Sequence, residues 1–374
     1  MKIGIVLPYD ISKGGGVQEI AKAQLEGLRR RGHEVYLVTP KPPNHDGLSK
    51  QGVIFVGGSA DLRSPGSTTV QVSAGLTEDI EKMLAHHKFD ILHFHEPWLP
   101  MLSRQILSRS QAVNVATFHA KLPDTVMMRT MSRVIVPYMR TVLKHIDAFV
   151  AASEAGGEYV STLTDHPVAV IPVDIDLTKF KWPEKFDDDK AVKTILYVGR
   201  LEGRKGVKYL LHALKQLHEW RPDVRLEILG DGVDRAKLEM LADDLELEQV
   251  EFLGYRDNAE KIKRFAAADL YCSPAVFGEG FGMVLLEAMA TGVPSVVGDN
   301  PGYAGVMKGM GELSLVNPRD TLQFARRLEL MLYEKELRAA WRKWAKKEVQ
   351  QYSTEHMLDQ YEEVYRRALA AKNK

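Results

Sequence analysis

The stretch Thr194-Ile-Leu-Tyr-Val-Gly-Arg-Leu-Glu-Gly-Arg-Lys-Gly206, which leads into Val207–Arg221, decides the fold of this chain. Its first residues, Thr194–Val198, are a short apolar run that predicts a buried strand, and Val207–Arg221 has the apolar spacing of an amphipathic helix. Segments of these two kinds alternate along most of the sequence. Because such alternation is typical of parallel sheets with helices on both faces, we predict an α/β fold.

Two series of strand candidates divide the chain. The first series contains Ile3–Leu7, Val35–Val38, Val53–Val56, Ile91–Phe94, Val113–Thr117, Ala148–Ala151 and Val168–Ile171. A charged segment without apolar periodicity, Lys181–Lys193, follows and is interpreted as a linker. The second series contains Thr194–Val198, Leu226–Leu229, Glu251–Leu253, Leu270–Cys272 and Ser295–Val297. Three helices are expected after it, at Arg319–Tyr333, Glu336–Gln350 and Thr354–Ala370. We predict two doubly wound domains facing across a cleft, with ligands at the carboxyl ends of the strands.

The composition excludes several classes of protein. With 374 residues the chain is long enough for two domains, and its 50 basic residues cancel its 50 acidic ones, so no general attraction to nucleic acid is expected. No apolar run approaches the roughly 18 residues of a membrane span, and the start lacks the features of a secretory signal. The sole cysteine, Cys272, excludes a disulfide within the chain and a cysteine metal cluster. We expect a cytoplasmic enzyme, and peripheral membrane contact stays open.

Two segments combine glycine or positive charge with a helix start. Gly14-Gly15-Gly16 lies between the first strand and the helix Val17–Arg31, where backbone N–H groups are able to approach an anion. Arg200 and Arg204-Lys205-Gly206 follow the strand Thr194–Val198 and suit a diphosphate, because charge-assisted hydrogen bonds to phosphate are strong. A flexible loop and a solvated basic turn are the respective alternatives.

Two glutamates lie around a glycine loop in Glu279-Gly-Phe-Gly-Met-Val-Leu-Leu-Glu287. The glycines permit close approach of the backbone to a ligand, and the helix that follows offers N–H donors for phosphate. Glu287 falls in an otherwise apolar segment, where an unpaired charge is costly, so we expect it to have a partner. A structural salt bridge is the alternative explanation.

Histidines end two strands of the first domain, in His93-Phe-His-Glu-Pro97 and Thr117-Phe-His119. They lack the spacing of common metal sites, so we expect no metal there and interpret His119 as a hydrogen-bond donor to phosphate or sugar. Asp174-Ile-Asp176 and Asp187-Asp-Asp189 match a metal-binding Asp-x-Asp pattern, but their positions at the domain crossover and in the linker favour solvated turns.

With these motifs in hand, the chain resembles a family four retaining glycosyltransferase with the GT-B fold. The motifs that carry the resemblance are Gly15-Gly16-Val17, Phe94-His95-Glu96-Pro97, Thr117-Phe118-His119, Gly199-Arg200 with Arg204-Lys205-Gly206, Glu279-x7-Glu287 and Gly292-x-Pro294. The start of the chain is similar to that of bacterial phosphatidylinositol mannosyltransferases, which use GDP-mannose. The resemblance implies an N-terminal acceptor-side domain over residues 1–172, a nucleotide-sugar domain over 173–353 and a C-terminal helix, 354–374, that returns to the first domain.

The resemblance also implies a role for each site residue. His119, Arg200, Lys205 and Glu279 would be catalytic: Arg200 and Lys205 neutralise the diphosphate, Glu279 holds the transferred sugar, and His119 assists at the diphosphate or sugar. Glu287 would bind the ribose hydroxyls. The remaining contacts to the donor would come from Gly15, Gly16, Arg256, Phe281, Gly282, Met283 and Val284. The implied reaction moves a hexose from a nucleotide-diphosphate sugar to a hydroxyl group of a lipid or glycan, without a metal cofactor. GDP-mannose is the favoured donor and a UDP-sugar is the alternative.

Two departures from the family pattern bear on the acceptor and the hinge. The usual Pro-Asn-Gly-Val-Asp crossover reads Pro172-Val-Asp-Ile-Asp176 here, and Leu76–Lys88 lacks the strongly basic character of the lipid-binding helix. Met127–His145 carries basic residues among apolar ones, although a helix with one solvated basic face explains it equally. The alternative function is a nucleotide-sugar 2-epimerase of the same fold, which isomerises the donor without an acceptor.

Overall fold

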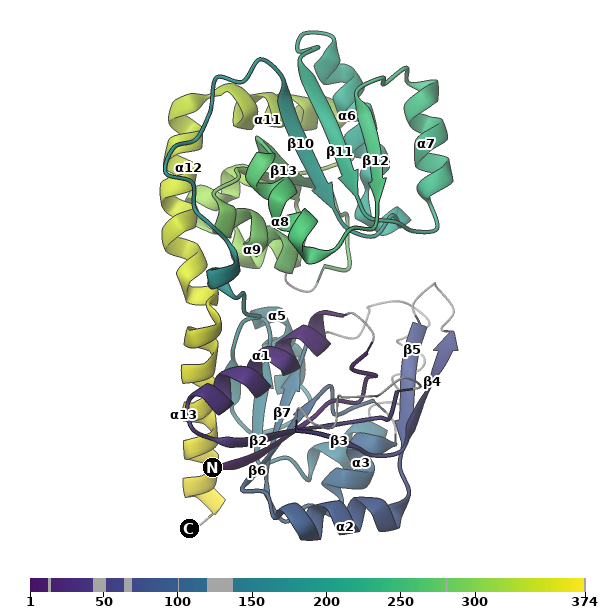
Figure 1. Cartoon of the computed structure of the whole chain (residues 1–374), viewed down its shortest axis with the longest axis vertical. Helices are drawn as coiled ribbons and strands as arrows, with labels where there is room; N and C mark the ends of the chain where they lie inside the picture. The colour runs from purple at the N-terminus through teal and green to yellow at the C-terminus, as the bar shows by residue number, and fades with distance from the viewer. Residues whose placement is uncertain are drawn as a thin grey trace. The chain divides into compact units, whose positions relative to one another are not determined.

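The computed structural model describes residues 1–12, 15–42, 52–63, 69–99, 101–119, 137–279 and 282–372. The chain forms two compact units (Figure 1). Unit 1 contains Met1–Asp174 and Thr354–Lys374, and unit 2 contains Ile175–Ser353. The helix candidate Met127–His145 lies largely outside the described residues.

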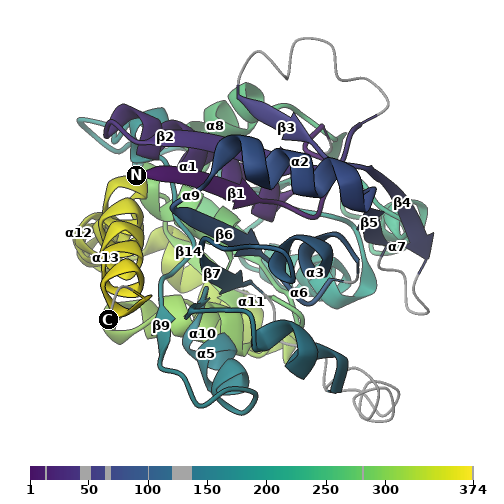
Figure 2. The same ribbon diagram turned by 90° about the horizontal axis from the view of Figure 1, so that it is seen from below.

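Unit 1 is built on a seven-stranded parallel sheet with the order β3-β2-β1-β6-β7-β8-β9 (Figure 2). Its strands are β1 (Lys2–Val6), β2 (Glu34–Thr39), β3 (Val53–Phe55), β6 (Ile91–His95), β7 (Val113–Phe118), β8 (Ala148–Ala151) and β9 (Val168–Val170). Every residue of β6 and β7 is buried, because helices cover both faces of the sheet. The strand prediction missed an antiparallel hairpin, β4 (Gly58–Arg63) with β5 (Thr69–Ala74).

The helices of unit 1 include the end of the chain. They are α1 (Gly16–Arg30), α2 (Thr77–His87), α3 (Leu102–Leu107), α5 (Glu154–Ser161) and α13 (Thr354–Lys372). The last of these packs against α1 and β7. Arg31 is paired with three acidic side chains of α13, including Glu362 at 2.9 Å, and Tyr361 and Tyr365 are buried. The terminal helix is therefore part of the core of unit 1.

Unit 2 is built on a six-stranded parallel sheet with the order β12-β11-β10-β13-β14-β15. Its strands are β10 (Lys193–Val198), β11 (Val224–Leu229), β12 (Val250–Gly254), β13 (Leu270–Ser273), β14 (Ser295–Gly298) and β15 (Leu315–Val316). Its helices are α6 (Val207–His218), α7 (Arg235–Asp244), α8 (Asn258–Ala267), α9 (Met283–Thr291), α10 (Pro301–Val306), α11 (Thr321–Tyr333) and α12 (Lys335–Glu348). Two doubly wound parallel sheets confirm the predicted fold class. Within the described ranges, no helix is long and apolar enough to cross a membrane.

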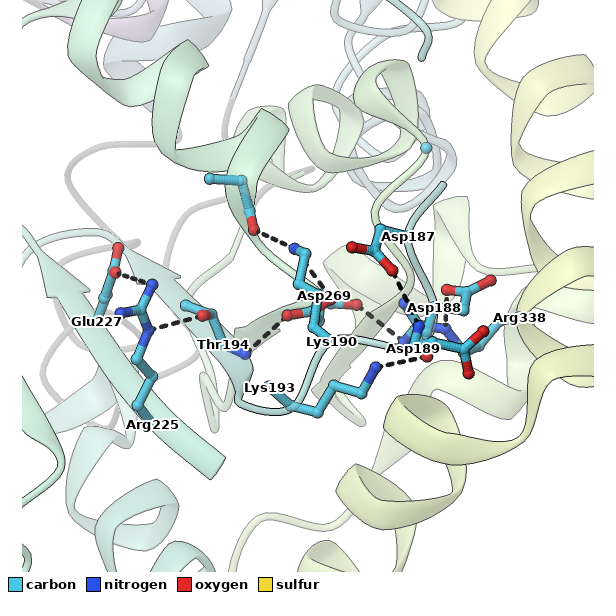
Figure 3. A network of polar contacts seen from close by, with 12 residues as sticks. Asp187, Asp188, Asp189, Lys190, Lys193, Thr194, Arg225, Glu227, Asp269 and Arg338 are labelled. Atoms are coloured by element: carbon cyan, nitrogen blue, oxygen red, sulfur yellow. Dashed lines mark hydrogen bonds and ion pairs between the residues drawn. The ribbon is translucent and has the colours of Figure 1, made fainter. Parts of the chain in front are cut away.

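The two Asp-x-Asp segments are only partly solvated turns. Asp187 and Asp189 are exposed, as predicted, whereas Asp174 and Asp188 are held by other side chains, which corrects the sequence interpretation for these two residues. Asp188 accepts a hydrogen bond from the guanidinium group of Arg338 at 2.8 Å (Figure 3). It also accepts one from Arg342 at 2.7 Å, and both arginines belong to α12. The hydrogen bond from Arg342 and the charge of Arg338 hold the Asp188 pKa well below its usual range. Asp174 is buried and accepts a hydrogen bond from Thr354. These carboxylates attach the linker and the last helix, and no trio of His, Cys, Asp or Glu able to hold a metal occurs in the part of the chain that the structure describes.

Candidate active site

The loop after β10 carries the predicted cations and is shaped by Gly206. This residue has φ of 72°, and a Cβ there would lie 2.1 Å from the carbonyl oxygen of Pro274, so only glycine fits. Gly206 ends the 3-10 turn Gly203–Lys205 and precedes α6. The backbone therefore turns tightly at the carboxyl end of β10 and presents its basic side chains there.

Glu279 holds two of these cations. Its Oε1 accepts a hydrogen bond from Arg204 Nη1 at 3.0 Å and one from Lys205 Nζ at 2.6 Å. The Glu279 side chain is only 11% exposed. Arg204 is also paired with Glu202 at 3.0 Å, so two carboxylates compensate its charge. The sequence predicts Lys205 and Glu279 as site residues, but the contact between them joins segments 74 residues apart and has no local signal.

Arg200 lies at the same end of β10 and is more accessible. Its side chain is 61% exposed and is paired with Glu202 Oε1 at 2.8 Å. The Arg200 carbonyl oxygen accepts a hydrogen bond from the hydroxyl group of Tyr197, which orders the backbone just after the strand. Arg200, Arg204 and Lys205 thus form a basic group, with Glu202 and Glu279 bridging its members. We call these five residues the cation cluster.

Glu287 lies one to two turns into α9. Its charge has a partner, as expected from the sequence. Its Oε1 accepts a hydrogen bond from Lys261 Nζ of α8 at 2.6 Å. Its Oε2 is buried and has no hydrogen-bond partner among the described residues. Burial raises the Glu287 pKa, and the positive charge of Lys261 opposes that rise. The sequence alone did not indicate Lys261, because the helices α8 and α9 become neighbours only when unit 2 folds.

The start of α9 is the other glycine-dependent feature. Gly282 precedes the helix with φ of 93°, and a Cβ there would lie 2.7 Å from the Tyr303 ring. Met283 and Val284 form the half-buried first turn, whose N–H groups have no side-chain cap. Phe281 lies outside the described residues. Arg256 is exposed in the loop between β12 and α8, the helix that carries Lys261.

The remaining predicted residues belong to unit 1. Gly15 is the N-cap of α1, which begins at Gly16 and has no side-chain cap, so its first N–H groups are open to an anion. His119 follows β7, and its Nε2 lies 2.7 Å from Nδ1 of His95. Its backbone N–H donates to Glu96 Oε1 at 2.8 Å. Burial lowers the His119 pKa to about 4, so the ring is uncharged at neutral pH.

Comparison with known proteins agrees with this arrangement of two parallel sheets. The structure matches sucrose-phosphate synthase from Thermosynechococcus elongatus with a TM-score of 0.79 at 21% identity, over 99% of each chain. It matches Anabaena HepE, solved with UDP and glucose, with a TM-score of 0.75 at 20% identity, over 97% of this chain and 98% of that one. The fold is thus that of the GT-B glycosyltransferases.

The sequence identifies the family more narrowly. Residues 14–179 match the model "Glycosyltransferase Family 4" and residues 178–348 match "Glycosyl transferases group 1". Phosphatidyl-myo-inositol mannosyltransferase of Mycolicibacterium smegmatis is 31% identical over 98% of this chain and 93% of its own length. The enzyme of the same name from Mycobacterium tuberculosis H37Rv is 33% identical over 86% of this chain and 84% of its own length.

The chain belongs to glycosyltransferase family 4, as predicted. It is a retaining glycosyltransferase that uses a nucleotide-sugar donor and transfers the sugar to an acceptor. The nucleotide-sugar 2-epimerase that the sequence left open finds no support in these comparisons.

Proposed function

We propose that this enzyme transfers mannose from GDP-mannose to a hydroxyl group of a lipid or glycan. The observation that carries the proposal is the 31% identity to a phosphatidyl-myo-inositol mannosyltransferase over 98% of the chain. The same stretch of sequence supplies the cation cluster and Glu287. A cytoplasmic location, with peripheral contact at the inner face of the membrane for a lipid acceptor, is part of this proposal.

The cation cluster is proposed to receive the diphosphate. Glu279 holds Arg204 and Lys205 in place before any ligand arrives, so less side-chain entropy is lost when phosphate binds. Arg200 is exposed, and its side chain would turn from Glu202 toward a second phosphate. Positive side chains stabilise the negative charge that develops on the departing nucleoside diphosphate. In other enzymes a bound metal ion stabilises this charge.

Glu287 is proposed to bind the ribose. A buried carboxylate oxygen without a partner is rare in native structures and calls for an explanation, and Oε2 of Glu287 is such an atom in the described part of the chain. The two hydroxyl groups of a ribose are donors that satisfy it. The positive charge of Lys261, at the opposite oxygen, favours the charged form of the carboxylate. The salt bridge and the ligand role are therefore compatible.

Glu279 is proposed to hold a hydroxyl group of the transferred sugar as well as the cations. Oε1 is engaged by Arg204 and Lys205, whereas no hydrogen bond of Oε2 to a described residue is found. A carboxylate near the sugar also stabilises positive charge at the anomeric carbon as the bond to phosphate breaks. His119, Gly15 and Gly16 of unit 1 are proposed as further contacts to the donor, with Arg256 near the base and Phe281 to Val284 at the sugar and phosphate.

The charge on α2 bears on the acceptor. This helix exposes Glu78 and Glu81, which pair with Lys82 and Arg109. A helix with compensated charges is not attracted to anionic lipid, since such attraction comes from an excess of Lys and Arg. A glycan or a weakly charged lipid acceptor is thus as consistent with the charges on α2 as phosphatidylinositol is.

A donor and acceptor panel tests the proposal. Release of nucleoside diphosphate is measured for GDP-mannose, GDP-glucose, UDP-glucose and UDP-galactose, each with phosphatidylinositol vesicles, with mannosides and without acceptor. The proposal predicts the fastest acceptor-dependent release from GDP-mannose. Preference for a UDP-sugar contradicts the proposed donor, and acceptor-independent isomerisation of the donor contradicts sugar transfer.

A further inference from the structure

His119 stands at the end of a buried chain of hydrogen bonds. Its Nε2 lies 2.7 Å from Nδ1 of His95, and Nε2 of His95 lies 3.0 Å from Oε1 of Gln24. Gln24 comes from α1 and His95 from β6, and neither side chain is exposed. The two imidazole rings are stacked with centroids 5.0 Å apart. At the free end, His119 Nδ1 is buried and has no partner among the described residues.

The hydrogen-bonding capacity of each group determines where the protons are. Burial lowers the pKa of both His95 and His119, so each ring is neutral and has one N–H donor and one acceptor nitrogen. An amide oxygen only accepts, so His95 carries its proton on Nε2 and accepts at Nδ1. His119 must then donate through Nε2, which leaves a lone pair on Nδ1.

A second buried branch orients the amide of Gln24. The hydroxyl group of Tyr361, from α13, lies 3.0 Å from Thr117 Oγ1. Burial raises the Tyr361 pKa, whereas Thr117 and the Gln24 amide lower it, as hydrogen-bond donors do. The amide nitrogen of Gln24 is buried and has no hydrogen-bond partner in the described ranges. The orientation assigned to the amide places its oxygen 3.0 Å from His95 Nε2, and the effect of the amide on the Tyr361 pKa is that of a donor.

We propose that Gln24 and His95 fix His119 in the tautomer whose Nδ1 accepts a hydrogen bond, so that it binds a hydroxyl group of the transferred sugar. Phosphate oxygens are themselves hydrogen-bond acceptors, so they do not donate a hydrogen bond to this nitrogen. This acceptor role replaces the donor role expected from the sequence, and Gln24 and His95 are positioning residues. The choice of the sugar as the source of the hydroxyl group rests on the proposed function.

Nitrogen NMR of the enzyme labelled with ¹⁵N-histidine tests the tautomer directly, with His119→Asn used to assign the signals. The proposal predicts that His119 is protonated at Nε2 and not at Nδ1. Gln24→Met removes the acceptor and should give a mixture of tautomers. Tyr365→Phe is the matched control, because it removes a buried hydroxyl group that is hydrogen-bonded to His93 and not to Gln24, His95 or His119, and it should keep the predominant wild-type tautomer.

The opposite result in the wild-type protein, a proton on Nδ1 of His119, would overturn the proposal and show that the Gln24 amide is reversed. An unchanged His119 signal in folded Gln24→Met would also overturn it. The wild-type spectrum is sufficient by itself if the variant proves unstable. Because the spectrum needs no substrate, it stands apart from the donor panel, and failure of GDP-mannose there does not affect it.

Kinetics separates positioning from a structural role. Gln24→Met should lower turnover of the intact donor by about tenfold, the order expected for one lost hydrogen bond, and leave the affinity for free nucleoside diphosphate within about twofold. Tyr365→Phe should change both quantities by less than about twofold. A parallel loss of diphosphate affinity in Gln24→Met would indicate a disturbed fold and contradict the inference.

Discussion

The Lys261→Met substitution leaves the buried Glu287 carboxylate without its cation. The two side chains are 18% and 14% exposed, and their charged atoms lie 2.6 Å apart. Removal of one partner from a fully buried ion pair costs about 3–5 kcal/mol, and partial exposure brings our expectation to about 2–3 kcal/mol. Part of that cost is avoided when Glu287 takes up a proton, since burial already raises its pKa.

Protonation of Glu287 links donor affinity to pH. In the wild type, the charge of Lys261 opposes the rise that burial causes in the Glu287 pKa, so affinity for nucleoside diphosphate should depend on pH less steeply than in the variant. In Lys261→Met, the pKa of Glu287 rises further, and affinity should increase with pH as the carboxylate ionises and regains its strength as an acceptor for ribose. Calorimetric titration with GDP at several pH values measures this slope.

Glu287→Gln provides the control, because an amide does not titrate in this range. It should weaken GDP binding by about 1.5–3 kcal/mol at every pH. The free energy of unfolding supplies an independent check. Because the folded-state pKa of Glu287 is raised, stability falls as pH rises from the unfolded pKa through the folded one, and Lys261→Met extends that window upward. A pH-independent affinity in Lys261→Met would refute this reasoning about the pair.

Three further predictions concern other parts of the molecule. Glu279→Gln should lower turnover and leave GDP affinity in calorimetry within about threefold, because the gain in net positive charge opposes the loss of pre-organisation of Arg204 and Lys205. A loss of GDP affinity as large as that of Glu287→Gln would contradict the division of roles between the glutamates. Burial lowers the pKa of His93 to about 3 and that of His119 to about 4. Below pH 6.5, the free energy of unfolding should therefore fall by about 1.4 kcal/mol per pH unit for each of these histidines. Urea titrations that give the same free energy of unfolding at pH 7 and at pH 5 would contradict this. Gly206→Ala should destabilise the fold by roughly 1–3 kcal/mol or more, since its Cβ meets a backbone carbonyl oxygen at 2.1 Å, whereas Gly305→Ala meets nothing within 4 Å and should leave the melting temperature nearly unchanged.

The fold is predictable from the sequence because its sheets are parallel and buried on both faces. Strands such as β6 and β10 are apolar without interruption, and that pattern is visible in isolation. The hairpin of β4 and β5 was missed because Gly58–Arg63 contains no apolar run that would indicate a strand. Antiparallel pairing at the rim of a domain depends on neighbours that a one-dimensional pattern does not contain.

The candidate site is only partly predictable for the same reason. Lys205, Glu279 and Glu287 are recognisable because glycine turns and helix starts accompany them in the sequence. Their partners are not, since Lys261 reaches Glu287 from another helix. Asp188 shows the reverse error: its charged surroundings indicate a solvated turn, but two arginines of α12 bury and hold it.

The central claim is that side-chain cations, and not a metal ion, neutralise the diphosphate of GDP-mannose. The most direct measurement is the initial rate of acceptor-dependent GDP release in the presence of EDTA, for the wild type and for Lys205→Ala. We predict that EDTA leaves the wild-type rate unchanged and that Lys205→Ala lowers it by about 10²–10³-fold, the range for loss of one stabilising donor. Abolition of wild-type turnover by EDTA, with recovery on addition of Mg²⁺ or Mn²⁺, would contradict the account.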